Sequence, residues 1–453
     1  MGNEALFRDK PIWNAILTLA VPAVLTILIM VVYNIADMFF IGMLGDDDQV
    51  AAVAVVGPVF SLATAVATTV GAGGCAVIAK TLGAQERDKA SKLSGLCIWA
   101  TILFGVVFTL LLLTATRPIL RLLGAAETLM GYAGMYMRVL AAGSTFMLFS
   151  VAMASVVRAE GAVIPGMLSN ISGTIVNLVL DPVFILVLGW GVGGAAAATV
   201  LGNMTSSVML AAYIRKKSRI IRLLPRVTGK DIAFLSHILA VGLPNGISSV
   251  LSGLASTFSN RLLSQYGTGA IAAMAAAGRA VLVLTMVQMG ICMGVSPLLA
   301  YNYGAKNLSR LRETLQKTTI LTVSFGLIAS VGCFLGRGAL VGLFLQDADN
   351  LALGSRLMIW LILAGPVLGL YYLGSNFLQA AGNALHATGV SVLRQGALLI
   401  PLLYLLHAML GLTGIAVAHT VSDFLSAGIA VALCLRQYRR LLAETAAVGK
   451  RAE

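Results

Sequence analysis

Charged residues are scarce in this chain. They make up 11% of its 453 residues, whereas hydrophobic residues make up 58%. Soluble globular domains contain about 25% charged residues, and a chain so poor in charge cannot build their usual surface. The composition therefore excludes an ordinary soluble protein and predicts one whose surface is largely covered by lipid.

Cysteine and histidine are also few, and their spacing excludes several kinds of site. The five cysteines lie in apolar runs and lack the spacing of a metal site or a disulfide framework, so we interpret them as packing residues. The four histidines do not cluster, and the sequence contains no P-loop and no nucleophile elbow. We expect no metal site, no cofactor, no ATP-driven step and no enzyme activity.

Long apolar runs recur from Ala15 to Leu435. A helix needs about 20 apolar residues to cross a bilayer, and turn motifs such as LGDDD and GWGVGG separate the runs. The first run is long and lacks a well-placed cleavage site, so it is the first span rather than a signal peptide. The predicted fold is an all-α polytopic membrane protein. Its twelve predicted helices are 15–44, 49–80, 93–116, 129–157, 163–188, 194–214, 233–264, 269–301, 316–336, 356–380, 387–409 and 413–435.

The basic residues give these spans an orientation. If the N-terminus is inside, most of the 31 Lys and Arg residues fall in inside loops, and the acidic runs near Asp46 and Asp347 fall outside. This pattern follows the positive-inside rule. It predicts a multi-pass protein of the cytoplasmic membrane with both termini cytoplasmic. The basic surplus then faces anionic lipid, which argues against nucleic acid as a partner.

The chain repeats itself after about 221 residues, as weak internal symmetry in transporters does. LGAQERDKASKL (82–93) matches YGAKNLSRLRET (303–314), and GVGGAAAAT (191–199) matches GLTGIAVAH (411–419). Each half has six spans, so we expect two six-helix lobes related by a pseudo-twofold axis along the membrane normal. The predicted division is an N-terminal lobe at 1–214, a cytoplasmic linker at 215–232, a C-terminal lobe at 233–436 and a cytoplasmic tail at 437–453.

The stretch VNLVLDPVFIL (176–186) places an acid inside an apolar span. Ionisable residues at that depth face a cavity or a partner. Asn177 lies one turn before Asp181, and Tyr33 lies one turn before Asp37, so each pair shares a helix face. With Thr199, these oxygen-bearing side chains predict a site for a coupling ion, either a proton or a sodium ion.

Pro182 follows the acid directly. Proline removes an amide donor and clashes with the carbonyl one turn earlier, so the fifth span should bend or loosen beside Asp181. Such a bend couples naturally to an ionisable group. The alternative is that it serves only helix packing.

Other polar and aromatic residues have more than one interpretation. Glu160 and Arg158 read either as a solvated loop pair or as a functional pair, and Asp423 can pair with Arg394 structurally or line a substrate cavity. Flexible Met and aromatic side chains suit either a promiscuous pocket or ordinary packing. The candidate cavity residues are Phe146, Phe149, Met286, Gln288, Met289, Asn260, Arg394 and Asp423.

The chain resembles the multidrug and toxic compound extrusion (MATE) family of antiporters over about residues 10–436. The resemblance lies in ADMFFIG (36–42), GAQERDKA (83–90), RAEG (158–161), NLVLDPVFI (177–185) and YNYGAKN (301–307). It implies two lobes that open alternately to each side. It also implies that Asp37, Asn177, Asp181 and Thr199, joined in some members by Tyr33, bind the coupling ion. One branch of the family has acids in the seventh and tenth spans, which this chain lacks.

The resemblance implies an antiporter that exports amphipathic, often cationic, organic compounds, and we expect a monomer. The alternative is a lipid-linked oligosaccharide flippase of the same superfamily. A flippase should line its cavity with several basic residues, but the candidates Arg138, Arg261, Arg279 and Arg394 are scattered along the sequence.

The predicted orientation can be tested by cysteine labelling. In a cysteine-free background, a membrane-impermeant maleimide should label Asp47→Cys on intact cells and Lys217→Cys only after permeabilisation. Labelling of both positions from the same side would contradict the twelve-span topology.

Overall fold

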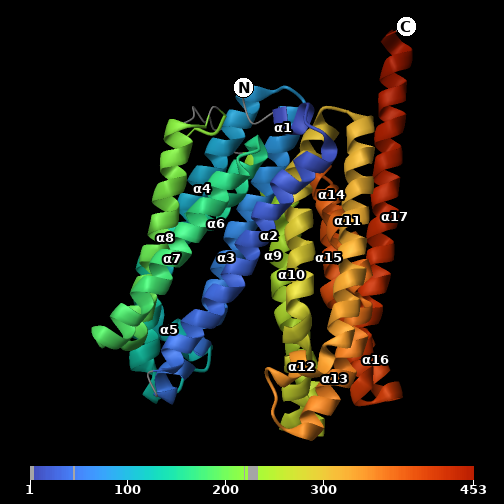
Figure 1. Cartoon of the computed structure of the whole chain (residues 1–453). Helices are drawn as coiled ribbons and strands as arrows, with labels where there is room; N and C mark the ends of the chain where they lie inside the picture. Colours follow the sequence, from blue (N-terminus) through green and yellow to red (C-terminus); the bar gives the residue numbers. More distant parts are fainter. Residues whose placement is uncertain (1–4, 44–45, 219, 223–232, 453) are drawn as a thin grey trace. The chain divides into compact units, whose positions relative to one another are not determined.

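A computed structural model describes residues 5–43, 46–218, 220–222 and 233–452, and for residues 34–39, 41–42, 47 and 447–452 it describes the backbone alone. The described residues form helices and no strands (Figure 1). Within the described part of the chain, eleven helices are long and apolar enough to cross a membrane, and the number is twelve if one bent helix pair forms a single span. This confirms the predicted all-α polytopic fold.

The chain divides into two compact units. The first contains residues 25–242 and the second contains residues 5–24 and 243–453. The unit boundaries therefore fall inside two helices, α2 (Ile12–Gly42) and α9 (Ala233–Leu263), near Pro22 and Pro244. The sequence instead suggested a division at the linker 215–232, most of which lies outside the described residues.

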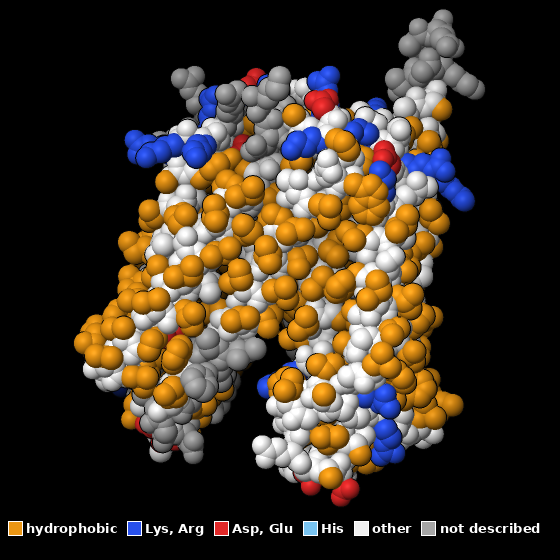
Figure 2. Space-filling model, in the orientation of Figure 1, with side chains coloured by type: hydrophobic (Ala, Val, Ile, Leu, Met, Phe, Trp, Pro, Cys, Tyr) orange, Lys and Arg blue, Asp and Glu red, His pale blue; other side chains and the backbone are white. Residues whose placement is uncertain are grey.

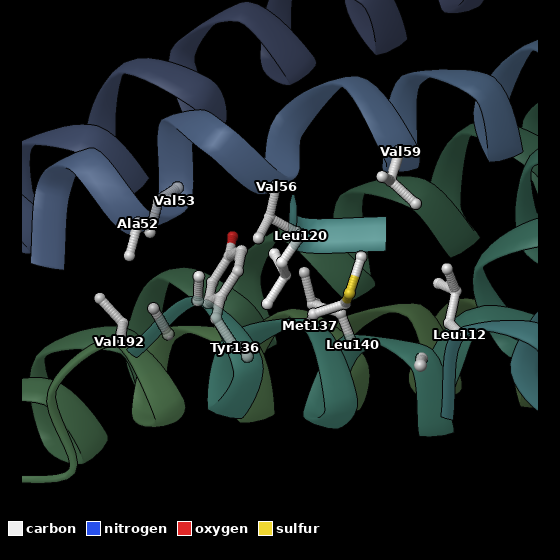
Figure 3. Packing of buried hydrophobic residues seen from close by; sticks show 14 of the residues in the cluster. Ala52, Val53, Val56, Val59, Leu112, Leu120, Tyr136, Met137, Leu140 and Val192 are labelled. Carbon is white, nitrogen blue, oxygen red and sulfur yellow. The ribbon is translucent and has the colours of Figure 1, made fainter. Parts of the chain in front are cut away.

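Unit 1 is built around one central helix. α6 (Met130–Val156) packs against α3 (Asp47–Gly83), α4 (Arg87–Thr114) and α8 (Gly191–Lys216), and α7 (Val163–Pro182) packs against α8. Val56 of α3 meets Tyr136 and Met137 of α6 in a buried cluster, to which the short helix α5 (Thr116–Leu122) adds Leu120 (Figure 3). The same cluster includes Val192 of α8, so this apolar packing sets the position of α8 against α6.

Unit 2 has a similar plan. α10 (Thr268–Gly304) packs against α11 (Leu308–Leu335), α13 (Ala348–Leu363) and α14 (Gly365–Ala380). α17 (Leu412–Ala452) packs against α14 and α16 (Leu399–Leu410). Two short helices, α1 (Ala5–Arg8) and α12 (Arg337–Gly342), and α15 (Ala384–Val392) complete the unit. The N-terminal segment is tied to it because Arg310 donates to the carbonyls of Phe7 and Lys10 at 3.2 and 2.8 Å.

Among the described helices, three depart from their predicted bounds in ways that have a clear local cause. The tenth span is longer and is broken between α13 and α14, which meet at a bend of 46°, because Pro366 at the start of α14 has no amide proton to continue the helix. The ninth begins at Leu308, where the Asn307 side chain caps it. α17 continues to Ala452 beyond its neighbours in the unit, since the tail contains many good helix formers (Figure 1).

The internal repeat is visible in the backbone. Gln85 and Lys306 both adopt positive φ, at 65° and 54°, which is uncommon for residues other than glycine. Gly161 and Gly382, both with φ of 80°, also occupy matching places in the two halves. α8 begins at Gly191 and α17 begins directly after Gly411, and these glycines have φ of 54° and 60°. The two halves therefore share turn geometry as well as sequence.

Charged side chains are segregated along the helices. In each unit Lys and Arg side chains gather at the end drawn uppermost, in unit 2 a further group lies near the opposite end, and the surface between the ends is largely apolar (Figure 2). At the start of α3, Asp46 caps the helix and accepts a hydrogen bond from Gln49 at 3.0 Å, which lowers the pKa of its carboxyl group. Gln49 in turn accepts from the amide of Val192 at 3.0 Å, which holds the first turn of α8 in place.

The close approach of α9 to α3 can be tested at a single glycine. A Cβ at Gly242 would lie 1.8 Å from the Thr69 carbonyl oxygen, whereas a Cβ at Gly253 on the same helix would meet nothing within 4 Å. We expect Gly242→Ala to lose about 1–3 kcal/mol of stability from overpacking. The measurement is the thermal unfolding midpoint of the purified protein, with Gly253→Ala as the matched control. Equal midpoints for the two variants would refute the contact.

Candidate functional site

The fifth span carries the buried acid. Asp181 has 0% and Asn177 has 2% of its surface exposed. The Asn177 amide nitrogen lies 3.3 Å from the Asp181 carboxylate and donates to it along the same face of α7. The shared helix face expected from the sequence therefore holds a hydrogen bond between these two residues in the structure.

The sixth span completes the cluster. The Asn177 amide also donates to the Thr199 hydroxyl at 3.3 Å, and the Tyr33 hydroxyl lies 3.4 Å from the same Thr199 oxygen. Tyr33 comes from α2, so three helices of unit 1 contribute. Asn203 of α8, which the sequence did not single out, donates to the Thr199 carbonyl at 2.9 Å.

Small residues bring α7 and α8 together. A Cβ at Gly202 would lie 2.6 Å from the Gly173 carbonyl oxygen, and Ser206 of α8 donates to the Ser169 carbonyl at 2.8 Å. With larger side chains at Gly173 and Gly202, Asn177 and Thr199 could not meet. The approach of the two backbones is thus a condition for the site.

The helix changes its winding directly behind the acid. α7 ends at Pro182, and the next five residues form the π-helix η3 (Val183–Val187). Because Pro182 has no amide proton, the carbonyl one turn earlier loses its usual donor, and the wider π winding follows. The loosening expected from the sequence takes this form. Gly194 of α8 packs against η3, where a Cβ would lie 2.8 Å from the Phe184 carbonyl group.

The cluster has the donor set of a hard-cation site. The carbonyl oxygen of the Asn177 side chain is buried and has no hydrogen-bond partner among the described residues. Together with the Asp181 carboxylate and the Thr199 hydroxyl, it offers oxygen atoms of the kind that sodium prefers, and a proton can bind at the carboxylate itself. The side chain of Asp37, the remaining predicted member, lies outside the described residues.

A second polar centre lies in unit 2. Arg394 donates through Nε to Asp423 at 2.6 Å, and its guanidinium carbon lies 4.5 Å from the ring centroid of Tyr371 and 5.4 Å from that of Tyr372. The side chains of Arg394 and Asp423 are 12% and 15% exposed. Arg394 stands in the π-helix η6 (Leu393–Ala397), and Ser422 donates to its carbonyl at 2.7 Å. The suggested pairing of Arg394 with Asp423 is present.

The other candidate cavity residues are dispersed. Gln288 is buried, and its amide donates to the carbonyls of Thr322 and Gly365 at 3.1 and 2.7 Å, so it joins three helices of unit 2. Phe149 is also buried, whereas Phe146 is partly exposed. Met286 and Met289 are half-buried, and Asn260 is exposed. The structure does not gather these residues into the cluster around Asp181.

Glu160 and Arg158 do not form a solvated pair, contrary to one interpretation of the sequence. They are only 4% and 8% exposed. Glu160 accepts hydrogen bonds from Tyr213 at 2.9 Å and Ser218 at 2.8 Å, and Arg158 donates to Ser155 at 2.7 Å. Glu160 is therefore held at the C-terminal end of α8, and Arg158 is held against the end of α6. Their partners lie more than fifty positions away or in the preceding helix, so charge spacing alone could not show this arrangement.

Comparison with known proteins agrees with this architecture. The MatE family model matches the chain twice, over residues 22–183 and 244–405. The chain belongs to the MatE family. The two matches confirm the internal repeat and identify the protein as a member of a family of membrane transporters.

Several relatives of this MATE protein are known. It is 27% identical over 447 residues to the multidrug export protein MepA of Staphylococcus aureus strain MSSA476, covering 98% of this chain and 99% of that protein. It is 28% identical to MepA of Staphylococcus saprophyticus, covering 94% and 95%. A MATE crystal structure in the bent conformation superposes with a TM-score of 0.91 at 24% identity, covering 98% and 99%. An outward-facing multidrug resistance MATE transporter gives 0.90 at 24% identity, covering 97% and 98%.

The buried ion pair of this MATE protein makes a specific prediction. Removing one partner leaves an uncompensated charge, so Arg394→Gln or Asp423→Asn alone should cost about 2–3 kcal/mol, less than for a fully buried pair. The double variant should be more stable than either single variant, which thermal unfolding of all four proteins will show. If the two single losses simply add in the double variant, the pair does not stabilise the fold.

Proposed function

We propose that this MATE protein is a cation-coupled antiporter that exports amphipathic, often cationic, organic compounds across the cytoplasmic membrane. The observation that carries the proposal is the buried cluster of Asp181, Asn177, Thr199 and Tyr33 in unit 1. A carboxylate that is buried away from water carries a large free-energy cost when it is charged and unpaired. Binding a cation removes much of that cost. The MepA relatives, which are named multidrug export proteins, support the class of cargo.

The coupling ion, a proton or a sodium ion, would bind at Asp181. Asn177 would orient the carboxylate through its amide, Thr199 and the Asn177 carbonyl would supply further oxygen ligands, and Asp37 would contribute from α2. Release of the ion would leave the desolvated Asp181 carboxylate with an uncompensated negative charge. That charge would favour a different arrangement of the helices in the lobe. An ion can drive a conformational change only through such a difference in affinity between two states.

Pro182 and η3 would form the part of the lobe where the fifth span changes its winding. A π-helical turn already lacks the regular hydrogen-bond ladder, so a change of winding there costs less than in an α-helix. The turn directly follows Asp181, and Gly194 of α8 packs against it. The charge state of the acid can therefore act on the winding beside it.

The flippase alternative receives less support from the geometry. A pyrophosphate headgroup needs several basic side chains that converge. Arg394 is paired with Asp423, Arg138 donates to the Gly134 carbonyl at 3.2 Å, and Arg279 lies 5.9 Å from the ring of Phe344. These arginines are engaged at separate places.

The proposal is tested with the purified protein in proteoliposomes under an imposed proton or sodium gradient. Asp181→Asn should abolish gradient-driven dye export while dye binding, followed by fluorescence anisotropy, changes little. Pro182→Ala should slow turnover more than it weakens binding, because it restores a donor to the helix. Asp423→Asn should impair export less than Asp181→Asn does. Normal export by Asp181→Asn under both gradients would show that the acid is structural.

A further inference from the structure

The two halves of the chain place different residues at the same point. α8 begins at Gly191 and α17 begins directly after Gly411, and both glycines have positive φ. Eight residues after these glycines stand Thr199 in the first half and His419 in the second. His419 therefore occupies the position that Thr199 holds in the candidate coupling site.

The helix contacts at this position also correspond. In unit 1 the Thr199 hydroxyl lies 3.4 Å from the hydroxyl of Tyr33 on α2, the first long helix of that half. In unit 2 the His419 Nε2 atom lies 3.3 Å from the hydroxyl of Ser259 on α9, which is the matching helix. The same two helices thus meet through a polar side chain in each half. In the second half the side chain is an imidazole, which can bind a proton near neutral pH.

Two charged side chains, Asp423 and Arg394, act on His419. Asp423 lies one turn further along α17, on the same face, and Arg394 lies in η6; both act on His419 electrostatically. From α14, the Tyr372 hydroxyl lies 3.5 Å from Arg394. α9 contributes the neutral Ser259, and α13 and α16 face this part of α17 with apolar residues such as Leu357 and Leu403. Since Arg394 and Asp423 neutralise each other, the charge of this centre is set by His419.

We propose that His419 is a second proton-binding site, located in unit 2 at the repeat position of the coupling site. The half-buried imidazole is neutral while Arg394 holds Asp423. When it binds a proton, two cations share one carboxylate and the centre gains a net positive charge. Proton binding at His419 does not depend on the proposed function, but its effect on the release of cargo rests on that function.

The consequence is that protonation of His419 favours release of a cationic cargo. A positive charge added to a partly desolvated centre repels other cations more strongly than it would in water. It also weakens the hold of Asp423 on Arg394, since the carboxylate is shared. An acidic side of the membrane would thereby promote release, and unit 2 would contribute to antiport without an acid at the repeat position of Asp181.

Proton binding is tested directly by nuclear magnetic resonance of the full-length protein, labelled with ¹⁵N-histidine, in lipid nanodiscs. The chain has only four histidines, and the signal lost in His419→Gln identifies the residue. We expect that signal to titrate between about pH 5 and pH 8, the range in which histidine changes charge. A signal that does not move over this range would overturn the proposal, whether or not the protein exports cations.

The effect on cargo is tested with tetraphenylphosphonium, whose charge does not change with pH. The Asp181→Asn variant serves as the parent, because it removes the carboxyl group of Asp181 from the proposed coupling site. The affinity of this variant for tetraphenylphosphonium should be about tenfold weaker at about pH 5 than at about pH 8, as expected for one added positive charge. His419→Gln and His419→Thr, the latter carrying the residue of the first half, should each abolish this dependence, whereas His407→Gln, at a surface histidine that contacts Tyr266, should keep it.

The outcomes of the two experiments are separable. If the His419 signal titrates but both His419 variants keep the pH dependence, the claim that its proton acts on the cargo is overturned. If the protein binds no organic cation at any pH, the proposed export function fails while the titration still decides the proton site. If His419→Gln does not fold, His419→Thr supplies the assignment.

Discussion

Asp181 is wholly buried, and a carboxylate at that depth must be hydrogen-bonded, neutralised or bound to a cation. The polar contacts of the first unit follow from this requirement. Asn177 donates to the acid from one turn earlier and reaches Thr199 across the helix boundary. That reach exists only because Gly173 and Gly202 let α7 and α8 approach closely. The site is therefore a product of backbone packing as much as of its polar side chains.

Each of the π-helices η3 and η6 lies at a buried or nearly buried ionisable residue, Asp181 in unit 1 and Arg394 in unit 2. η3 directly follows Asp181 and Pro182, and η6 contains Arg394. A π turn interrupts the regular hydrogen-bond ladder and is frequent at functional sites. In η6 the hydroxyl of Ser422 supplies a donor to the Arg394 carbonyl. The π winding therefore has different surroundings in the two units: it follows Pro182 in η3, whereas in η6 a side-chain hydroxyl bonds a carbonyl of the π turn.

The repeat keeps the backbone and changes the chemistry. Turns with positive φ recur at matching places, including the non-glycine pair Gln85 and Lys306. In the second half, however, Leu399–Pro401 reads LIP where the first half has LDP, so its acid is missing. Charge reappears there as the pair of Arg394 and Asp423 beside His419. Duplication preserved the scaffold because helix packing depends on shape, while side chains lining the interior were free to diverge.

The sequence by itself determined the membrane class, the twelve spans, the repeat and the common helix face of Asn177 and Asp181. Each of these depends on local quantities, namely apolar length, helical periodicity and turn residues. Only the tertiary structure decided that Thr199 meets both Asn177 and Tyr33, that Gln288 joins three helices, and that Glu160 is buried against Tyr213 and Ser218. It also decided that α2 and α9 each pass from one compact unit to the other. Such contacts join residues far apart in the chain, and they depend on which helix faces approach each other, which periodicity within one helix does not specify.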